Sequence, residues 1–137
     1  MKRSDPAGRR GRILLVEDDA DAAYYAVHVL TRIGGFEVSH TPDPAVAIQR
    51  ACCLPWDLVL TDVDLPGMTG SELIEALRQA VPGLPVAVLT ARAAADASLD
   101  GLRGQAAALL HKPVPPARLI AVVAALIPER PGLSWTR

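Results

Sequence analysis

The chain has 137 residues, half of them apolar, and a formal net charge of −1. This length suits one domain with a core of its own and leaves little room for a second. A charge so close to zero gives no general attraction to nucleic acid or to a membrane surface, so any electrostatic function depends on local clusters. We therefore expect no direct contact with nucleic acid.

The amino terminus gives no sign of an export signal. Residues 1–11 combine arginine, glycine and proline without apolar periodicity, which predicts a disordered basic leader. Glu17 interrupts the apolar run behind the leader before it reaches signal-peptide length. The longest apolar run, residues 119–127, is too short to span a bilayer. We expect a cytoplasmic protein without membrane insertion.

The first half of the chain alternates strands and helices. A strand at residues 12–16 precedes a helix over residues 19–33, where small and apolar side chains recur at three- and four-residue steps until Gly34. A short strand follows at residues 36–40. An aspartate cap and a first-turn proline then open a second helix over residues 43–53.

The two cysteines, Cys52 and Cys53, are adjacent at the end of this helix. A disulfide between neighbours would be strained, and the spacing of metal-binding cysteines is absent. We expect both thiols to be reduced and buried.

The alternation continues beyond this point. A strand at residues 57–61 leads into a loop, and a Thr-x-x-Glu capping box from residue 69 opens the third helix. A fourth strand at residues 86–89 precedes an alanine-rich helix over residues 92–103, which contains few large apolar residues. We expect this helix to be the least anchored of the domain.

A fifth strand at residues 107–111 and a last helix, opened by Pro115 and Pro116, complete the pattern. The central strands are apolar throughout, as strands covered on both faces must be. The sequence predicts an α/β fold, a (βα)₅ three-layer sandwich over residues 12–127, followed by a C-terminal tail over residues 128–137. We expect no attached output domain.

Polar residues of one particular chemistry follow the apolar strands. Glu17 and Asp18 follow the first strand, Asp62 follows the third, Thr90 closes the fourth and Lys112 closes the fifth. Carboxyl ends of parallel strands meet at one edge of the sheet, where open α/β folds place their sites. Three carboxylates, a hydroxyl and an ammonium at this edge indicate a magnesium-dependent, phosphoryl-accepting pocket.

Four pieces of sequence carry a resemblance to a known family: ILLVEDD at the first strand, DLVLTDVDLPGMTG around Asp62, VLTA at Thr90 and HKP at Lys112. In this order and with these separations, the chain resembles the response-regulator receiver domains of bacterial two-component systems, such as chemotaxis response regulators. The resemblance covers roughly residues 12–127. It implies a flavodoxin-like fold with the parallel sheet order 2-1-3-4-5.

The resemblance also implies a role for each acidic residue. Asp62 is the expected phosphoacceptor, whose carboxylate attacks the phosphoryl group of a phosphohistidine on a sensor histidine kinase or phosphotransfer protein. The expected Mg²⁺ ligands are Asp18, Asp62 and the main-chain carbonyl of Asp64, with Glu17 acting through a water. Asp19 is expected to cap the first helix instead.

Lys112 and Thr90 are implied to act on the phosphoryl group itself. Lys112 offers a fixed positive charge to a phosphoryl oxygen. Thr90 donates its hydroxyl to the newly formed phosphate and draws the following loop inward. These roles describe a phosphorelay signalling protein and not an enzyme.

Three other positions have features of their own. Leu109 stands where receivers usually carry an aromatic switch residue, so signalling is expected to rely on backbone shifts or partner binding. His111 is expected to lie against the last helix as a neutral residue. Asp64 and Arg92 carry opposite charges, and we hypothesise that they pair across the mouth of the pocket.

The last helix has two sets of apolar residues, more than one core-facing stripe requires. One interpretation is deep burial between neighbours. The other is a surface for a downstream protein or a second copy, formed with the fourth strand, the fourth helix and the fifth strand. Since we expect no attached output domain, we also expect a stand-alone receiver that relays its signal by protein contact.

Two alternative functions stay open. In a pseudo-receiver, the same pocket would serve a binding module that signals by docking without phosphorylation, and Leu109 motivates this reading. In a haloacid-dehalogenase-type phosphohydrolase, Asp62 and Asp64 would form a D-x-D nucleophile motif. That reading fits poorly, because the chain has no candidate cap insertion.

Overall fold

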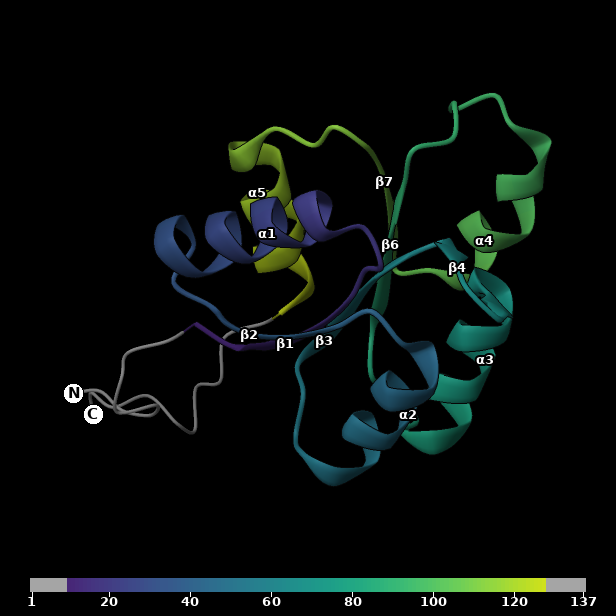
Figure 1. The fold of residues 1–137 in the computed structure, drawn as a ribbon, viewed down its shortest axis with the longest axis horizontal. Helices are drawn as coiled ribbons and strands as arrows, with labels where there is room; N and C mark the ends of the chain where they lie inside the picture. The colour runs from purple at the N-terminus through teal and green to yellow at the C-terminus, as the bar shows by residue number, and fades with distance from the viewer. Residues whose placement is uncertain (1–9, 128–137) are drawn as a thin grey trace.

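The computed structural model describes residues 10–127, so residues 1–9 and 128–137, where most of the expected leader and the expected tail fall, lie outside the described residues. Its centre is a five-stranded parallel sheet in the order β2-β1-β3-β6-β7 (Figure 1). The predicted order 2-1-3-4-5 is confirmed, because the labels β4 and β5 belong to a separate two-stranded hairpin. The sheet strands are β1 (Arg12–Val16), β2 (Glu37–Thr41), β3 (Leu58–Asp62), β6 (Val86–Thr90) and β7 (Ala108–His111).

Helices cover both faces of the sheet, as Figure 1 shows. The face beneath α1 and α5 is packed by one buried cluster, and the face beneath α2, α3 and α4 by another. The helices are α1 (Ala20–His28), α2 (Pro44–Cys53), α3 (Gly70–Ala80), α4 (Asp100–Gln105) and α5 (Pro116–Leu126).

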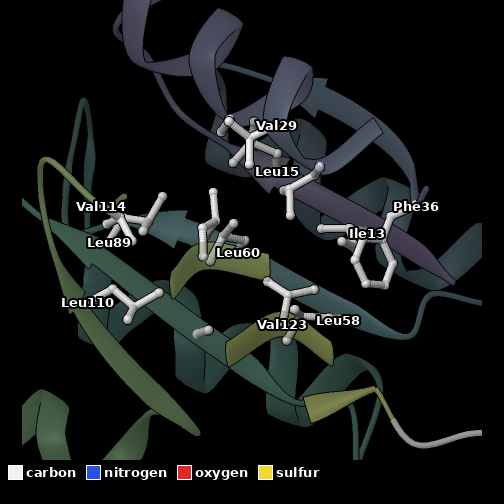
Figure 2. Close-up of a cluster of buried hydrophobic side chains, with 14 of the residues drawn as sticks. Ile13, Leu15, Val29, Phe36, Leu58, Leu60, Leu89, Leu110, Val114 and Val123 are labelled. Atoms are coloured by element: carbon white, nitrogen blue, oxygen red, sulfur yellow. The ribbon is translucent and has the colours of Figure 1, made fainter. Parts of the chain in front are cut away.

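Alternation along β1 explains how one short strand serves both layers. Ile13 and Leu15 point into the cluster of α1 and α5, drawn in Figure 2, whereas Leu14 and Val16 point into the opposite cluster. All four side chains are fully buried. Successive strand residues face opposite sides, so a strand covered on both faces must be apolar throughout.

The register of the sheet brings the strand ends together. Asp62 pairs with Leu89 across β3 and β6, and Thr90 pairs with His111 across β6 and β7. Consequently, the residues that follow β1, β3, β6 and β7 share one edge, as predicted.

The predicted helix caps are confirmed. Asp19 accepts a hydrogen bond from the amide of Ala22 at 2.8 Å and starts α1. Thr69 and Glu72 form both hydrogen bonds of a capping box at the start of α3. These caps orient the segments that follow the acidic strand ends.

The structure corrects the expected helix over residues 92–103. Residues 92–96 form a loop, a 3₁₀ turn spans η2 (Ala97–Leu99), and α4 has only six residues. Gly101 and Gly104 explain the short helix, because glycine is a poor helix former. Helix α4 is tied down mainly by the buried side chains of Leu99 and Leu102.

Two other segments differ in detail from the prediction. The expected helix over residues 19–33 ends in a π-helical turn, η1 (Val29–Ile33). The expected loop over residues 65–68 is the hairpin of β4 (Asp64–Leu65) and β5 (Met68–Thr69). Gly67 turns this hairpin with a φ of 80°.

The expectation of buried thiols is wrong, because both Cys52 and Cys53 are exposed. Helix α2 buries Pro44, Ala47 and Ala51, which recur at three- and four-residue steps along one face. The cysteines follow Ala51 directly and therefore turn away from that face. No helix in the described part of the chain is long and apolar enough to cross a membrane.

Candidate functional site

Three carboxylates meet at the carboxyl edge of the sheet. Glu17 and Asp18 follow β1, Asp62 ends β3, and each offers a carboxylate oxygen within 4.8 Å of the others. Glu17 is 1% exposed and Asp62 8% exposed, whereas Asp18 is exposed. The acidic cluster is thus buried on one side and reached from solvent on the side of Asp18.

Lys112 lies against two of these carboxylates. Its Nζ donates to Glu17 Oε1 at 2.6 Å and to Asp62 Oδ2 at 3.0 Å. Its own backbone amide donates to the carbonyl of Thr90 at 2.7 Å, which continues the pairing of β6 and β7. The sheet therefore fixes the backbone of Lys112, and the acids fix its ammonium group.

Burial and charge shift the protonation of this pair. Burial raises the pKa of Glu17, and the nearby charge of Asp62 adds to this, although hydrogen bonds from Lys112 and the amide of Asp19 oppose it. Burial alone would lower the pKa of Lys112, but its hydrogen bonds to Glu17 and Asp62, together with the negative charges of these two acids, raise it. Lys112 is therefore a charged ammonium at neutral pH.

Asp62 is held from two sides. Besides the Lys112 contact, its Oδ1 accepts a hydrogen bond from the amide of Asp64 at 3.1 Å. This bond ties the start of the β4–β5 hairpin to the carboxylate. The role of the Asp64 main-chain carbonyl as a metal ligand stays a prediction.

Thr90 is fully buried at the end of β6. Its Oγ1 accepts a hydrogen bond from the amide of Arg92 at 3.0 Å. The hydroxyl is thus engaged with the loop that follows its own strand, and its contact with a phosphoryl group stays a prediction.

The hypothesis that Asp64 and Arg92 pair is confirmed. The Arg92 guanidinium contacts both carboxylate oxygens of Asp64, through Nη2 and, at 3.4 Å, through Nε. Asp64 raises the pKa of Arg92 through this hydrogen bond and its charge. Both side chains are partly exposed, so the pair lies at the protein surface beside the acidic cluster.

A cleft of about 530 Å³ adjoins the pair. It lies among the β4–β5 hairpin, the start of α3 and the η2–α4 segment, with Asp64 and Arg92 on its wall. Val63, Leu65, Met68 and Leu102 give it an apolar part.

Several contacts at this edge were missed by sequence reasoning. His111 Nδ1 hydrogen-bonds to the carbonyl of Arg92 at 3.1 Å, whereas its expected position against the last helix stays a prediction. Tyr25 on α1 donates to the carbonyl of Val114 at 2.6 Å, just beyond Lys112. His40 on β2 contacts the carbonyl of Glu17 at 2.7 Å. Each joins a side chain to a distant backbone group, and no local pattern signals such a pairing.

The apolar residues of α5 are mostly accounted for by the core. Leu119, Val123 and Ile127 are buried, and Ile120, Val122, Ala124 and Leu126 are partly buried against the same cluster. Leu109 packs against the opposite cluster and is partly buried. Elsewhere in residues 10–127, the large apolar side chains that are exposed are Tyr24, Tyr25, Ile33 and Leu54.

The acidic cluster fits a divalent cation that prefers oxygen ligands. Glu17, Asp18 and Asp62 supply carboxylate oxygens close enough to share one ion. Asp18 is exposed and leaves an approach from solvent, whereas Lys112 already compensates part of the charge of the two buried acids. The chemistry of the donor set therefore suits Mg²⁺.

Fold and pocket together define a signalling receiver of the two-component type, and comparison with known proteins identifies the family. The family model described as the response regulator receiver domain matches residues 13–124. The chain belongs to this family. Receiver domains of response regulators accept phosphate from histidine kinases and act as regulatory signalling modules.

Known relatives agree with this assignment. The chain is 37% identical over 119 residues to the transcriptional regulatory protein PrrA of Mycobacterium leprae, a match that covers 87% of this chain and 51% of PrrA. It is 36% identical over 104 residues to the two-component response regulator PhoP of Pseudomonas aeruginosa, covering 74% of this chain and 45% of PhoP. The chain thus spans about half the length of these curated relatives.

Solved structures show the same fold. A CheY-like receiver domain protein from Methanospirillum hungatei is 28% identical with a TM-score of 0.75, covering 85% of this chain and 93% of the other. The receiver domain of the sensor histidine kinase PA1611 from Pseudomonas aeruginosa is also 28% identical, with a TM-score of 0.77 and coverage of 85% and 97%. That structure holds a magnesium ion in its active site cleft.

Proposed function

We propose that this receiver accepts a phosphoryl group on Asp62 from a histidine kinase or phosphotransfer protein and relays the signal by protein contact. The observation that carries the proposal is the placement of Lys112, whose ammonium bridges Glu17 and Asp62 beside the exposed Asp18. A buried carboxylate with a fixed cation next to it and an opening to solvent suits nucleophilic attack on phosphorus.

In the proposed reaction, a carboxylate oxygen of Asp62 attacks the phosphorus atom of a phosphohistidine. The new bond joins Asp62 to phosphorus, the bond from phosphorus to the imidazole nitrogen breaks, and the imidazole keeps the electron pair and leaves. Lys112 stabilises the negative charge on the phosphoryl oxygens. Glu17 also accepts a hydrogen bond from Lys112 and so keeps its ammonium beside Asp62.

Glu17, Asp18, Asp62 and the main-chain carbonyl of Asp64 are the groups proposed to hold Mg²⁺, with Glu17 acting through a water. Bound there, the ion would neutralise the clustered carboxylates that otherwise repel an incoming phosphoryl group.

Thr90 is proposed to act after the transfer. Its hydroxyl, now the acceptor for the Arg92 amide, would rotate to donate to a phosphoryl oxygen on Asp62. This movement would turn a local change in charge into a shift of the loop after β6. Because Leu109 replaces the usual aromatic ring, backbone movement is the proposed readout.

The proposed surface for a downstream protein comprises β6, α4, β7 and α5. Of the two helices on this surface, α4 is the shorter, with six residues that include two glycines, so it is the easier to displace. A second copy of the chain is the other candidate for this surface. The histidine donor would approach from the side of Asp18, where the acidic cluster is open.

Intact mass measurement tests the proposal directly. The protein is incubated with MgCl₂ and acetyl phosphate, a small acyl-phosphate donor. The wild type is expected to gain one phosphoryl group, and Asp62→Asn is expected to gain none. Asp100→Asn removes an exposed carboxylate outside the pocket and is the matched control that should behave as the wild type.

Two outcomes would overturn the assignment. An unmodified wild type under saturating donor and Mg²⁺ would favour a pseudo-receiver that signals by docking. Steady turnover of a generic phosphatase substrate that depends on Asp62 would favour a phosphohydrolase.

A further inference from the structure

Arg92 connects four separate segments around the cleft. Its guanidinium contacts Asp64 in the β4–β5 hairpin and donates to Ser98 Oγ in η2 at 2.5 Å. Its amide donates to Thr90 Oγ1 at 3.0 Å, and its carbonyl is hydrogen-bonded to His111 Nδ1 at 3.1 Å. One residue thereby joins the turn beyond the phosphoacceptor strand, the Thr90 hydroxyl, strand β7 and the start of the η2–α4 segment.

The η2–α4 segment, residues 97–105, depends on such tethers. Helix α4 has six residues, two of them glycine, which is too little to be stable as an isolated helix. Its buried anchors are Leu99 and Leu102. Its end is attached to α3 because Arg78 donates to the carbonyl of Gln105 at 2.6 Å. Its start is attached to the hairpin only through Ser98 and Arg92, so far as the described hydrogen bonds show.

The contacts of Arg92 respond to the state of the pocket. Asp64 is linked to the phosphoacceptor, because its amide donates to Asp62 Oδ1 at 3.1 Å. A phosphoryl group on Asp62 would place a charge of about −2 near the guanidinium. This group would compete with Asp64 for the guanidinium. A hydroxyl that turns toward this phosphoryl group would also leave the Arg92 amide without its acceptor.

We propose that Arg92 is a positioning residue whose side chain holds the η2–α4 segment in its unphosphorylated arrangement, and that phosphorylation loosens this segment. The second half of the proposal rests on the proposed function; the first half does not. A surface ion pair alone contributes little to stability. Here, however, one guanidinium spans two segments, and the segment that it secures has little stability of its own.

The first half is tested by amide hydrogen exchange on the full chain without phosphodonor and without Mg²⁺. Arg92→Ala is expected to accelerate exchange of residues 97–105 about three- to tenfold, because it removes both tethers at once. Ser98→Ala and Asp64→Asn are each expected to give a smaller acceleration. Arg92→Lys keeps the charge but cannot span Asp64 and Ser98 with one planar group, so it should restore only part of the protection.

Arg12→Ala is the matched control, because Arg12 forms a similarly exposed pair with Glu37 at the far end of the sheet. It should leave the exchange of residues 97–105 unchanged. If residues 97–105 of Arg92→Ala exchange at the wild-type rate, the first half of the proposal is overturned. Acceleration spread evenly over the whole chain would also overturn it, since that result indicates general destabilisation and not a local tether.

The second half is tested by repeating the measurement with acetyl phosphate and MgCl₂, with intact mass recorded on the same samples. Phosphorylated wild type is expected to exchange faster at residues 97–105, and Arg92→Ala is expected to show little further change. A phosphorylated wild type with unchanged exchange would overturn the second half and leave the proposed function standing. An unphosphorylated wild type would count against the proposed function, while the first half would still be decided by the unphosphorylated samples.

Discussion

At the scale of single residues, the pocket depends on one cation between two buried acids. Lys112 contacts Glu17 and Asp62, and its raised pKa keeps it charged. Removing this ammonium would leave two nearby carboxylates without compensation, which is more costly than losing an exposed ion pair. Glu17 therefore supports the proposed phosphoacceptor, Asp62, through Lys112 as well as through the proposed metal.

Asp96 gives a residue-scale prediction of pH dependence. Hydrogen bonds from the side chain and the backbone of Ser98 lower the pKa of Asp96 below 3.8. A carboxyl with a lowered pKa stabilises the fold at pH values above its ordinary pKa, and this contribution is lost as the pH falls through the folded-state pKa. The stability that the start of η2 contributes should therefore decrease when the pH is lower than about 4.

Urea unfolding of the wild type and Asp96→Asn from pH 2 to pH 7 measures this contribution. Asparagine keeps the accepting oxygen but does not titrate in this range, so the two stability curves should run parallel above about pH 5 and converge or cross only at lower pH. Parallel curves over the whole range would contradict the prediction.

The residues of the site could be predicted from sequence only where a local sequence pattern marks them. Glu17, Asp18 and Lys112 follow apolar strands and Asp62 ends one, so topology alone brings them to one edge. The contact of Tyr25 with Val114 spans 89 positions and involves a backbone carbonyl. No spacing rule predicts such a contact, because it depends on how α1 packs beside the loop after β7.

At the scale of elements, α4 shows how composition limits a helix. Gly101 and Gly104 lie within its six residues, and a Cβ added at either position would meet no other atom within 4 Å. Neither glycine has a positive φ, so neither is required by the backbone. The helix is short because of its composition and not because of steric limits around it.

Gly101→Ala and Gly104→Ala should each stabilise the protein by up to about 1 kcal/mol, because alanine loses less backbone entropy in a helix. Gly67→Ala is the matched control. It also has open space around the added Cβ, but its φ is 80°, so it should destabilise by about 1 kcal/mol. Midpoints of urea unfolding measure all three changes. Destabilisation by both helix variants would show that the flexibility of α4 is needed for its packing.

The ends of helices were predicted well where a capping residue marks them and poorly where tertiary contacts determine where the helix ends. The capping box at Thr69 and the cap at Asp43 marked the starts of α3 and α2. The π-helical end of α1 was not predicted, since the apolar pattern continues to Ile33. There, the Thr31 hydroxyl bonds to the carbonyl of Val27 at 2.7 Å, which supplies a partner that hydrophobic periodicity does not reveal.

At the scale of the whole molecule, parallel strands joined by short crossovers limit the sheet to a few possible strand orders. The order itself came from the family resemblance and is confirmed by the sheet. The exposure of Cys52 was not foreseen, because cysteine is usually buried and a residue at a helix end is hard to assign to one face.

The proposed metal site predicts a change in the stability of the whole domain. A ligand that binds only the folded state stabilises it by about 2.7 kcal/mol at a free concentration one hundred times its dissociation constant. Thermal unfolding should therefore shift upward in MgCl₂ relative to EDTA. Asp18→Asn should abolish the shift, whereas Asp21→Asn, an exposed acid in the first turn of α1, should retain it. Equal shifts in both variants would mean that Mg²⁺ acts elsewhere.

The central place of β1 has a consequence for how the chain acquires its structure during translation. Strand β1 is the first sheet strand to leave the ribosome, yet Leu15 lies between His40 of β2 and Leu60 of β3. A nascent chain that ends before β3 can shield only one edge of this strand, in which four of the five residues are apolar. Until Leu58–Asp62 emerges, the other edge is open to pairing with a neighbouring nascent chain or to capture by a chaperone.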